Sequence, residues 1–180
     1  TDPDRTHCEH ALRSLDFLVV TDLFMTDTAE LADVVFPAAA WAEVDGTQTN
    51  TERRIQRLRA AVPPQGDAMP DWWITSQLAK RMGFQGFEYE GPHEVFNECC
   101  ELSPIYQGVS WDAIEDGEYQ WPVPFDGHPG TPRLHEEEFV NGRGIFAIAE
   151  YRDPAETIDD DYPVWLTTGR RLASYHTRTQ

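Results

Sequence analysis

The feature that most constrains the fold of this chain is a pair of short apolar segments separated by a brief polar stretch. Residues 17–20 are apolar and lead into Thr21 and Asp22, and residues 34–36 form the second apolar segment, before Pro37. Two strands joined by one short helix imply a parallel pair with a crossover connection. The sequence therefore predicts an α/β layer fold.

Helical periodicity and end signals predict the remaining elements. Ile74, Leu78 and Met82 repeat every four residues after Asp71, and Gly83 is placed to end that helix. Three helices are expected, over residues 3–15, 71–82 and 93–102.

Two further segments are less regular. Side-chain oxygens in residues 26–28 can cap a turn over 29–32. Residues 38–61 follow neither the helical nor the strand period, so we expect an extended loop with a short strand near 55–58.

The charge balance excludes one class of partner. The 180 residues carry 32 acids against 14 Lys and Arg, for a net charge of −18, and Lys80 is the single lysine. Such a surface repels nucleic acid. The acid surplus predicts either a halophilic protein, in which hydrated carboxylates preserve solubility, or a merely acidic surface.

Cysteine usage and hydropathy indicate the compartment. Cys8, Cys99 and Cys100 are odd in number and two are adjacent, which argues against a disulfide framework. No segment has the length of a membrane span, and no basic-then-apolar leader opens the chain. We expect a cytoplasmic protein without a membrane span.

The first candidate site is the carboxyl end of the strand that contains residues 17–20. Thr21 and Asp22 lie where α/β sheets open a crevice for ligands. A carboxylate there can accept hydrogen bonds from ribose hydroxyls or from the N–H groups of a guanine edge. Thr26, on the following loop, is a weaker candidate of the same kind. The alternative is a solvated strand end.

Two other stretches have an ordinary local role. Asp71 begins a helix, where an aspartate commonly serves as the N-cap. In the loop 43–56, Gly46 permits a tight path, Asn50 can bond its own backbone, and Glu52 can pair with an adjacent arginine. That loop could simply fix its own shape.

A third block lies near the end of the chain. Thr168, Gly169 and Arg170 form a turn in which backbone amides and a guanidinium can cradle an anion. The candidates that follow it are Tyr175, His176 and Thr177.

The expected organisation has three regions. A partial α/β domain covers residues 1–115, and an extended linker rich in proline, glycine and acid covers 116–160. Residues 161–180 open a further domain with an apolar strand over 163–166. A strand without partners is not a stable domain, so we expect that domain to be truncated.

As a set, these motifs resemble the molybdopterin-guanine-dinucleotide oxidoreductases, large enzymes that hold molybdenum or tungsten between two pterin dinucleotides. The resemblance lies in residues 17–56 and in the Thr-Gly-Arg and His-Thr elements of 168–177. It implies a Rossmann-like domain followed by the start of a C-terminal β-barrel, and a bis-molybdopterin guanine dinucleotide with Mo or W. For Asp71 the resemblance implies a guanine ligand, a role that competes with the N-cap, and we favour the ligand. The residues that it implies in cofactor binding are Thr21, Asp22, Thr26, Asp71, Thr168, Gly169, Arg170, Tyr175, His176 and Thr177.

The linker motifs favour one subtype. Gln-Trp-Pro at 120–122, the Gly-Thr-Pro at 130–132 and Asn-Gly-Arg-Gly-Ile-Phe at 141–146 are most similar to the formate dehydrogenase catalytic subunit. Assimilatory nitrate reductases share part of this pattern and are the alternative. A cofactor-free relative, such as the large iron–sulfur subunit of complex I, is the alternative from another class.

The resemblance also implies what lies outside this chain. Formate is the expected small-molecule substrate, and electrons pass to iron–sulfur clusters elsewhere in the parent chain and in partner subunits. The remainder of the catalytic subunit is itself an expected partner. No catalytic residue or metal ligand falls in this segment, so the 180 residues alone should be inactive.

Overall fold

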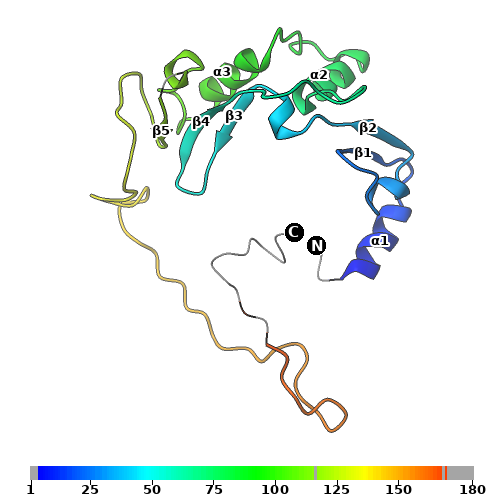
Figure 1. Ribbon diagram of the computed structural model, residues 1–180. Coiled ribbons are helices and arrows are strands. Elements are labelled where there is room, and N and C mark those ends of the chain that lie inside the picture. Colours follow the sequence, from blue (N-terminus) through cyan, green and yellow to red (C-terminus); the bar gives the residue numbers. More distant parts are fainter. Residues whose placement is uncertain (1–3, 116, 168, 170–180) are drawn as a thin grey trace. The chain divides into compact units, whose positions relative to one another are not determined.

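A computed structural model describes residues 4–115, 117–167 and 169 (Figure 1). The chain forms two compact units: a core unit, Thr6–Leu134, and a terminal unit that combines Thr1–Arg5 with His135–Gln180. Within the described residues, none of the helices has both the length and the apolar character needed to cross a membrane.

The core unit begins with the predicted parallel pair. Helix α1 (Arg5–Arg13) precedes strand β1 (Val19–Asp22), and a 3-10 turn, η1 (Ala29–Leu31), leads to strand β2 (Val34–Pro37). The two strands run parallel in register from Val19 opposite Val34 to Asp22 opposite Pro37. The parallel strand–helix–strand prediction is therefore confirmed.

A third extended segment continues this sheet beyond β2. Ala38 forms a parallel bridge with Met69. The amide of Met69 donates to the carbonyl of Pro37 at 3.1 Å, and that of Ala39 donates to Met69 at 2.9 Å. The amide of Ala38 instead donates to Asp22 of β1, at 3.1 Å. The end of β2 therefore lies between β1 and the segment at Met69.

Two helices follow, close to their predicted bounds. Helix α2 spans Asp71–Arg81 and helix α3 spans Pro92–Leu102. Met82 is the C-cap of α2, and Gly83 follows with φ of 85°. That left-handed conformation is the one for which glycine is favoured after a helix.

The loop predicted over 38–61 was wrong in part, because it contains a hairpin. Strands β3 (Gly46–Thr49) and β4 (Arg54–Leu58) pair antiparallel, and the short strand β5 (Tyr119–Gln120) adds to β4. A second 3-10 turn, η2 (Trp41–Glu43), lies between β2 and β3. The strand expected near 55–58 is confirmed as β4.

The core of this unit lies between the hairpin and α3. Ile55, Ile114 and Val123 are completely buried. Ile114 belongs to a third 3-10 turn, η3 (Asp112–Ile114). The cluster as a whole contains Ile55, Phe96, Cys100, Val109, Ile114 and Val123. Since Val123 belongs to it, the first part of the segment expected as linker packs inside the core unit, which extends to Leu134.

The prediction of a strand over residues 163–166 was wrong. These residues adopt no strand, and Val164 and Leu166 are 80% and 92% exposed. A strand gains its stability from ladder hydrogen bonds and cross-strand packing, and no described segment supplies a partner here. The barrel start, like the linker, stays a prediction.

The adjacent cysteines of α3 should differ sharply in reactivity. Cys100 is buried in the core whereas Cys99 is exposed. Burial, followed by the neighbouring Cys99, raises the pKa of the Cys100 thiol to about 11. At pH 8 we expect a thiol reagent to label Cys99 within minutes and Cys100 roughly a hundredfold more slowly until the chain is unfolded, as peptide mapping by mass spectrometry would show. Equal labelling of both thiols in the folded protein would contradict this placement.

Candidate functional site

Asp22 is the last residue of β1 and its carboxylate organises the loop that follows. Its Oδ1 accepts hydrogen bonds from the amides of Leu23 at 2.7 Å and Phe24 at 3.5 Å. Its Oδ2 accepts from the hydroxyl of Thr26 at 3.2 Å. A carboxylate offers about four acceptor positions, so this half-buried group can still accept from a ligand.

Thr26 has the capping role that its position predicted. Its Oγ1 accepts the amide of Ala29, the first residue of η1, at 3.3 Å. Because the same hydroxyl donates to Asp22, Thr26 holds that carboxylate in place. Thr21 is exposed at the end of β1. The structure therefore brings Thr21, Asp22 and Thr26 together at the end of β1 and the start of the loop that follows it.

Asp71 does not act as the N-cap of α2. The cap position is Pro70, which has no side-chain hydrogen bond, and Asp71 is the first helical residue. The carboxylate is exposed and makes no side-chain hydrogen bond or ion pair to the residues that the structure describes. Of the two roles that the sequence left open for Asp71, capping is not realised.

Asp22 and Asp71 lie at the same edge of the parallel sheet. Asp22 ends β1, and Asp71 comes two residues after Met69, the bridging residue on the other side of β2. Parallel strands end at the same edge, and two strand spacings amount to roughly 10 Å. This edge, defined by Asp22, Asp71 and the segment 38–41 between them, is called the carboxyl edge below.

The segment that leaves β2 at this edge is fixed by hydrogen bonds. A carboxylate oxygen of Glu43 accepts the amide of Ala40 at 2.8 Å. The carbonyl of Ala42 accepts the amides of Ala61 at 2.8 Å and Val62 at 3.2 Å. Trp41, which opens η2, is nevertheless 73% exposed. The sequence motifs did not single out Trp41, although a tryptophan directly after a strand end in a polar loop is a usable signal.

The arginines of the hairpin turn are engaged within the core unit. Arg53 donates to the backbone carbonyls of Trp121, Thr131 and Pro132. Arg54 pairs with Glu52 and Glu118. As predicted, the side chain of Asn50 bonds its own backbone, accepting the amides of Glu52 and Arg54. The turn therefore fixes its own shape.

Two arginines further along the chain are occupied as well. Arg57 and Arg59 both pair with Glu115. Arg59 is the first cause, and Arg57 a further one, of a lowered pKa at Glu115. The buried Nη1 of Arg57 has no hydrogen-bond partner in the described structure, but the guanidinium lies 3.4 Å over the ring centre of Trp111. That cation–π contact offsets part of the missing hydrogen bond.

The last predicted block lies almost wholly outside the described residues. Of its members only Gly169 is described, and it is exposed with open space around its Cα. The others, Thr168, Arg170, Tyr175, His176 and Thr177, lie outside the described part of the chain.

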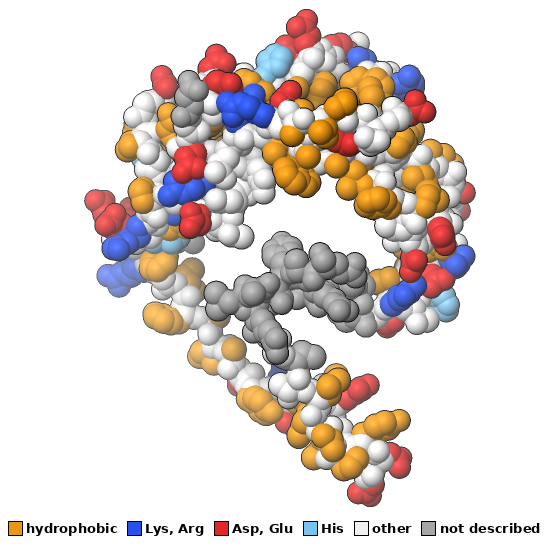
Figure 2. All heavy atoms as spheres, in the orientation of Figure 1, with side chains coloured by type: hydrophobic (Ala, Val, Ile, Leu, Met, Phe, Trp, Pro, Cys, Tyr) orange, Lys and Arg blue, Asp and Glu red, His pale blue; other side chains and the backbone are white. Residues whose placement is uncertain are grey.

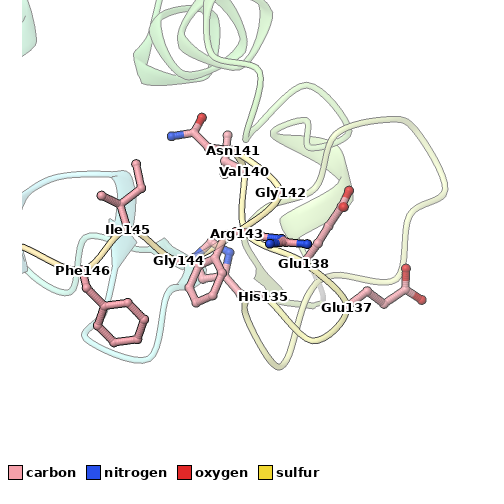
Figure 3. A pocket seen from close by; sticks show the side chains of 11 residues that line it. His135, Glu137, Glu138, Val140, Asn141, Gly142, Arg143, Gly144, Ile145 and Phe146 are labelled. Atoms are coloured by element: carbon pink, nitrogen blue, oxygen red, sulfur yellow. The ribbon is translucent and has the colours of Figure 1, made fainter.

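One hollow in the described residues belongs to the terminal unit and contains none of the predicted site residues. It has a volume of about 890 Å³ and is formed by one loop (Figure 3). The loop turns at Gly142, whose amide donates to the carbonyl of Phe139 at 2.7 Å, and the rings of Phe139 and His135 lie 5.0 Å apart. The lining residues are His135, Glu137, Glu138, Phe139, Val140, Asn141, Gly142, Arg143, Gly144, Ile145 and Phe146.

Comparison with known proteins decides the family. Residues 1–81, which contain all the site residues placed in the core unit, match the sequence family described as Molybdopterin oxidoreductase. An F420-dependent formate dehydrogenase subunit alpha of Methanocaldococcus jannaschii is 50% identical over 99% of this chain. The chain belongs to the molybdopterin oxidoreductase family. Membership implies a molybdopterin cofactor with Mo or W.

Other molybdopterin oxidoreductases agree with this assignment. An F420-dependent formate dehydrogenase 2 subunit alpha of Methanococcus maripaludis is 49% identical over 99% of the chain. A putative formate dehydrogenase of Bacillus subtilis, YrhE, is 40% identical over 97% of it. The chain spans 27% of the length of the first two relatives and 18% of the third.

One solved structure supports the fold. The acetylene hydratase of Pelobacter acetylenicus aligns with 64% of this chain and 16% of its own, at a TM-score of 0.51 and 27% identity. The shared fold is thus the mixed α/β arrangement with small parallel and antiparallel sheets.

The described residues fit one end of a pterin dinucleotide better than the other. Asp22 and Asp71 offer carboxylate acceptors, which suit the N–H groups of guanine and the hydroxyls of ribose. The arginines from Arg53 to Arg59 are already paired or bound to carbonyls, so they leave little positive charge for a pyrophosphate. These hydrogen-bond acceptors therefore suit a guanosine better than a pyrophosphate.

Proposed function

We propose that this chain contributes the guanosine-binding edge of a formate dehydrogenase of the molybdopterin oxidoreductase family. The single observation that carries the proposal is the carboxyl edge itself. Asp22 ends β1 on one side of β2, Asp71 follows the bridging residue Met69 on the other side, and Asp71 has an exposed, unpaired carboxylate in the described structure. Relatives named as formate dehydrogenase alpha subunits, at 48–50% identity, support the choice of formate.

The roles divide between the two acids. Asp71 accepts hydrogen bonds from the N–H groups of the guanine base, because its carboxylate is free to turn toward a ligand. Asp22, held by Leu23 and Thr26, accepts from a ribose hydroxyl with its remaining lone pairs. Thr21 adds a hydroxyl at the same edge. The block from Thr168 to Thr177 is proposed to meet the pterin and pyrophosphate end.

The proposal extends to the reaction and the acceptor. When bound, the bis-molybdopterin guanine dinucleotide with Mo or W supplies the redox chemistry by which formate gives carbon dioxide, a proton and two electrons. Iron–sulfur clusters in the parent chain and its partner subunits carry those electrons, and F420 is the acceptor that the names of the methanogen relatives support. The proposed setting is a cytoplasm, with the acidic surface serving as a halophilic adaptation.

Asp71→Asn in the full-length protein should lower cofactor content while the fold survives. The substitution replaces an acceptor with an NH₂ donor that faces the guanine N–H groups, and a mismatched polar group of this kind costs roughly 1–3 kcal/mol. The fold should tolerate it because Asp71 has no partner to lose among the described residues. Metal analysis, pterin fluorescence after oxidation and GMP released by hydrolysis measure occupancy.

Asp67→Asn is the matched control. Asp67 is exposed and lies before Met69, on the amino side of the same segment. Its substitution therefore removes the same negative charge as Asp71→Asn, but at a position away from the carboxyl edge. Unchanged occupancy in Asp71→Asn, or equal loss in both variants, would count against guanine recognition by Asp71. Wild-type protein that contains neither pterin nor metal and reduces no F420 with formate would instead favour a cofactor-free structural relative.

A further inference from the structure

We propose that Trp41 is the stacking platform for the purine base at the carboxyl edge, an inference that rests on the proposed guanosine site. Trp41 is 73% exposed, although a side chain of this size normally loses most of its surface on folding. Its ring makes no aromatic or cation–π contact with the described residues. Most of the ring is thus left unpacked by the described residues of the core unit.

The turn that carries Trp41 is rigid, which favours binding over a chance exposure. Glu43 closes η2 by accepting the amide of Ala40, and Ala42 is tied to the segment at Ala61 by two hydrogen bonds. A ring on an anchored turn loses little conformational freedom when a ligand stacks on it. Flexible loop tips that merely expose a hydrophobic residue have no such anchoring.

The turn that carries Trp41 follows the central segment of the sheet, whose two neighbours carry the acids. Ala39 is the last residue of the β2 segment bonded to Met69, and Trp41 follows two residues later, within roughly 7 Å of chain. Asp71 also lies two residues beyond its bridging residue, Met69, on one side of β2, and Asp22 ends β1 on the other. The central segment of the sheet therefore delivers the aromatic ring, and its two neighbours deliver the carboxylates.

These three groups meet the chemical needs of a purine nucleotide. The base has a π-face, which an indole ring stacks against, and the guanine edge has N–H donors, which a carboxylate accepts. Such a stack would also cover apolar surface on Trp41, one of several exposed hydrophobic side chains on this unit (Figure 2). Recognition would then divide into stacking by Trp41, which any purine satisfies, and edge pairing by Asp71, which selects guanine.

The test uses full-length protein prepared without cofactor, with GMP as the probe. Trp41→Ala should weaken GMP binding roughly 5- to 150-fold, and Trp41→Phe should retain most of the affinity because it keeps an aromatic face. Trp41→Leu retains apolar bulk without a π-face and should bind like Trp41→Ala. Titration calorimetry measures the affinity for GMP. The difference in tryptophan fluorescence between wild type and Trp41→Phe is the emission of Trp41, and its quenching by GMP reports stacking.

Phe84→Ala is the matched control, since Phe84 is 58% exposed but follows the far end of α2, about 16 Å from Asp71 along the helix.

Wild-type affinity in Trp41→Ala together with weakened binding in Asp71→Asn would overturn the Trp41 inference and leave the proposed function standing. Affinity in Trp41→Leu equal to wild type, or loss of the fold in both Trp41→Ala and Trp41→Leu, would assign the ring a packing role instead. Wild-type protein that binds no GMP, and carries no dinucleotide when prepared with cofactor, would reject the proposed function itself.

Discussion

Arg53→Met should loosen the segment from Trp121 to Pro132 by about 2–4 kcal/mol, because one guanidinium satisfies three backbone carbonyls of that segment. Methionine keeps the apolar stem of the side chain but leaves those carbonyls without a donor. The guanidinium also lies 5.5 Å from the ring centre of Trp121, so a cation–π contact is lost as well. Nothing in this expectation depends on a cofactor.

Native-state hydrogen exchange in the full-length protein measures the effect locally. The amides of Trp121 and Thr131 are bonded to the carbonyls of Arg53 and Gln120, at 3.1 and 2.8 Å, so their protection reports whether the segment stays docked. Arg54→Met is the control. Arg54 is half-buried, but its ion-pair partners are the exposed carboxylates of Glu52 and Glu118 and not the carbonyls of the segment from Trp121 to Pro132, so its loss should change protection little. Equal protection in Arg53→Met and wild type would show that the three contacts do not hold this segment.

Arg53 also shows why the hairpin escaped sequence-based prediction. The turn between β3 and β4 places Arg53 at φ 69°, a left-handed conformation in which hairpin turns normally have Gly or Asn. The tertiary contacts of its guanidinium and the side chain of Asn50 stabilise that conformation instead. A local rule that seeks Asn-Gly cannot see contacts with residues 121–132, which lie far along the chain.

The parallel sheet was predictable because its signals are local. Two apolar segments, an acid at a strand end and the capping threonine Thr26 all lie within residues 17–37, and β1, η1 and β2 form as expected. The third segment, at Met69, was not predictable, because a single bridging residue is too short to show the alternation of apolar and polar residues that indicates a strand. Yet that bridge is what brings Asp71 to the edge where Asp22 ends. Long-range pairing, rather than propensity, assembles the candidate site.

Gly108→Ala should be the most destabilising small substitution in the core unit. A Cβ built on Gly108 would lie 2.0 Å from the carbonyl oxygen of Phe125 and 2.9 Å from Cγ1 of Val123. The first of these contacts is with backbone, which a rotamer change cannot relieve. The amide of Gly108 also donates to Val123 at 2.7 Å, so moving the two segments apart breaks a hydrogen bond beside a fully buried side chain.

We therefore expect Gly108→Ala to cost about 3 kcal/mol, at the upper end of the usual range for overpacking. The amide of Val123, which donates to Ile105 at 2.8 Å, should exchange with solvent correspondingly faster in the full-length protein. Gly46→Ala is the matched control, because a Cβ there meets nothing within 4 Å and the residue lies in a strand, where alanine restricts the unfolded chain. If the two variants exchange alike at Val123, the close approach of residues 108 and 125 does not constrain the core, and the packing of the segment after β5 must rest on Arg53 and its three carbonyls.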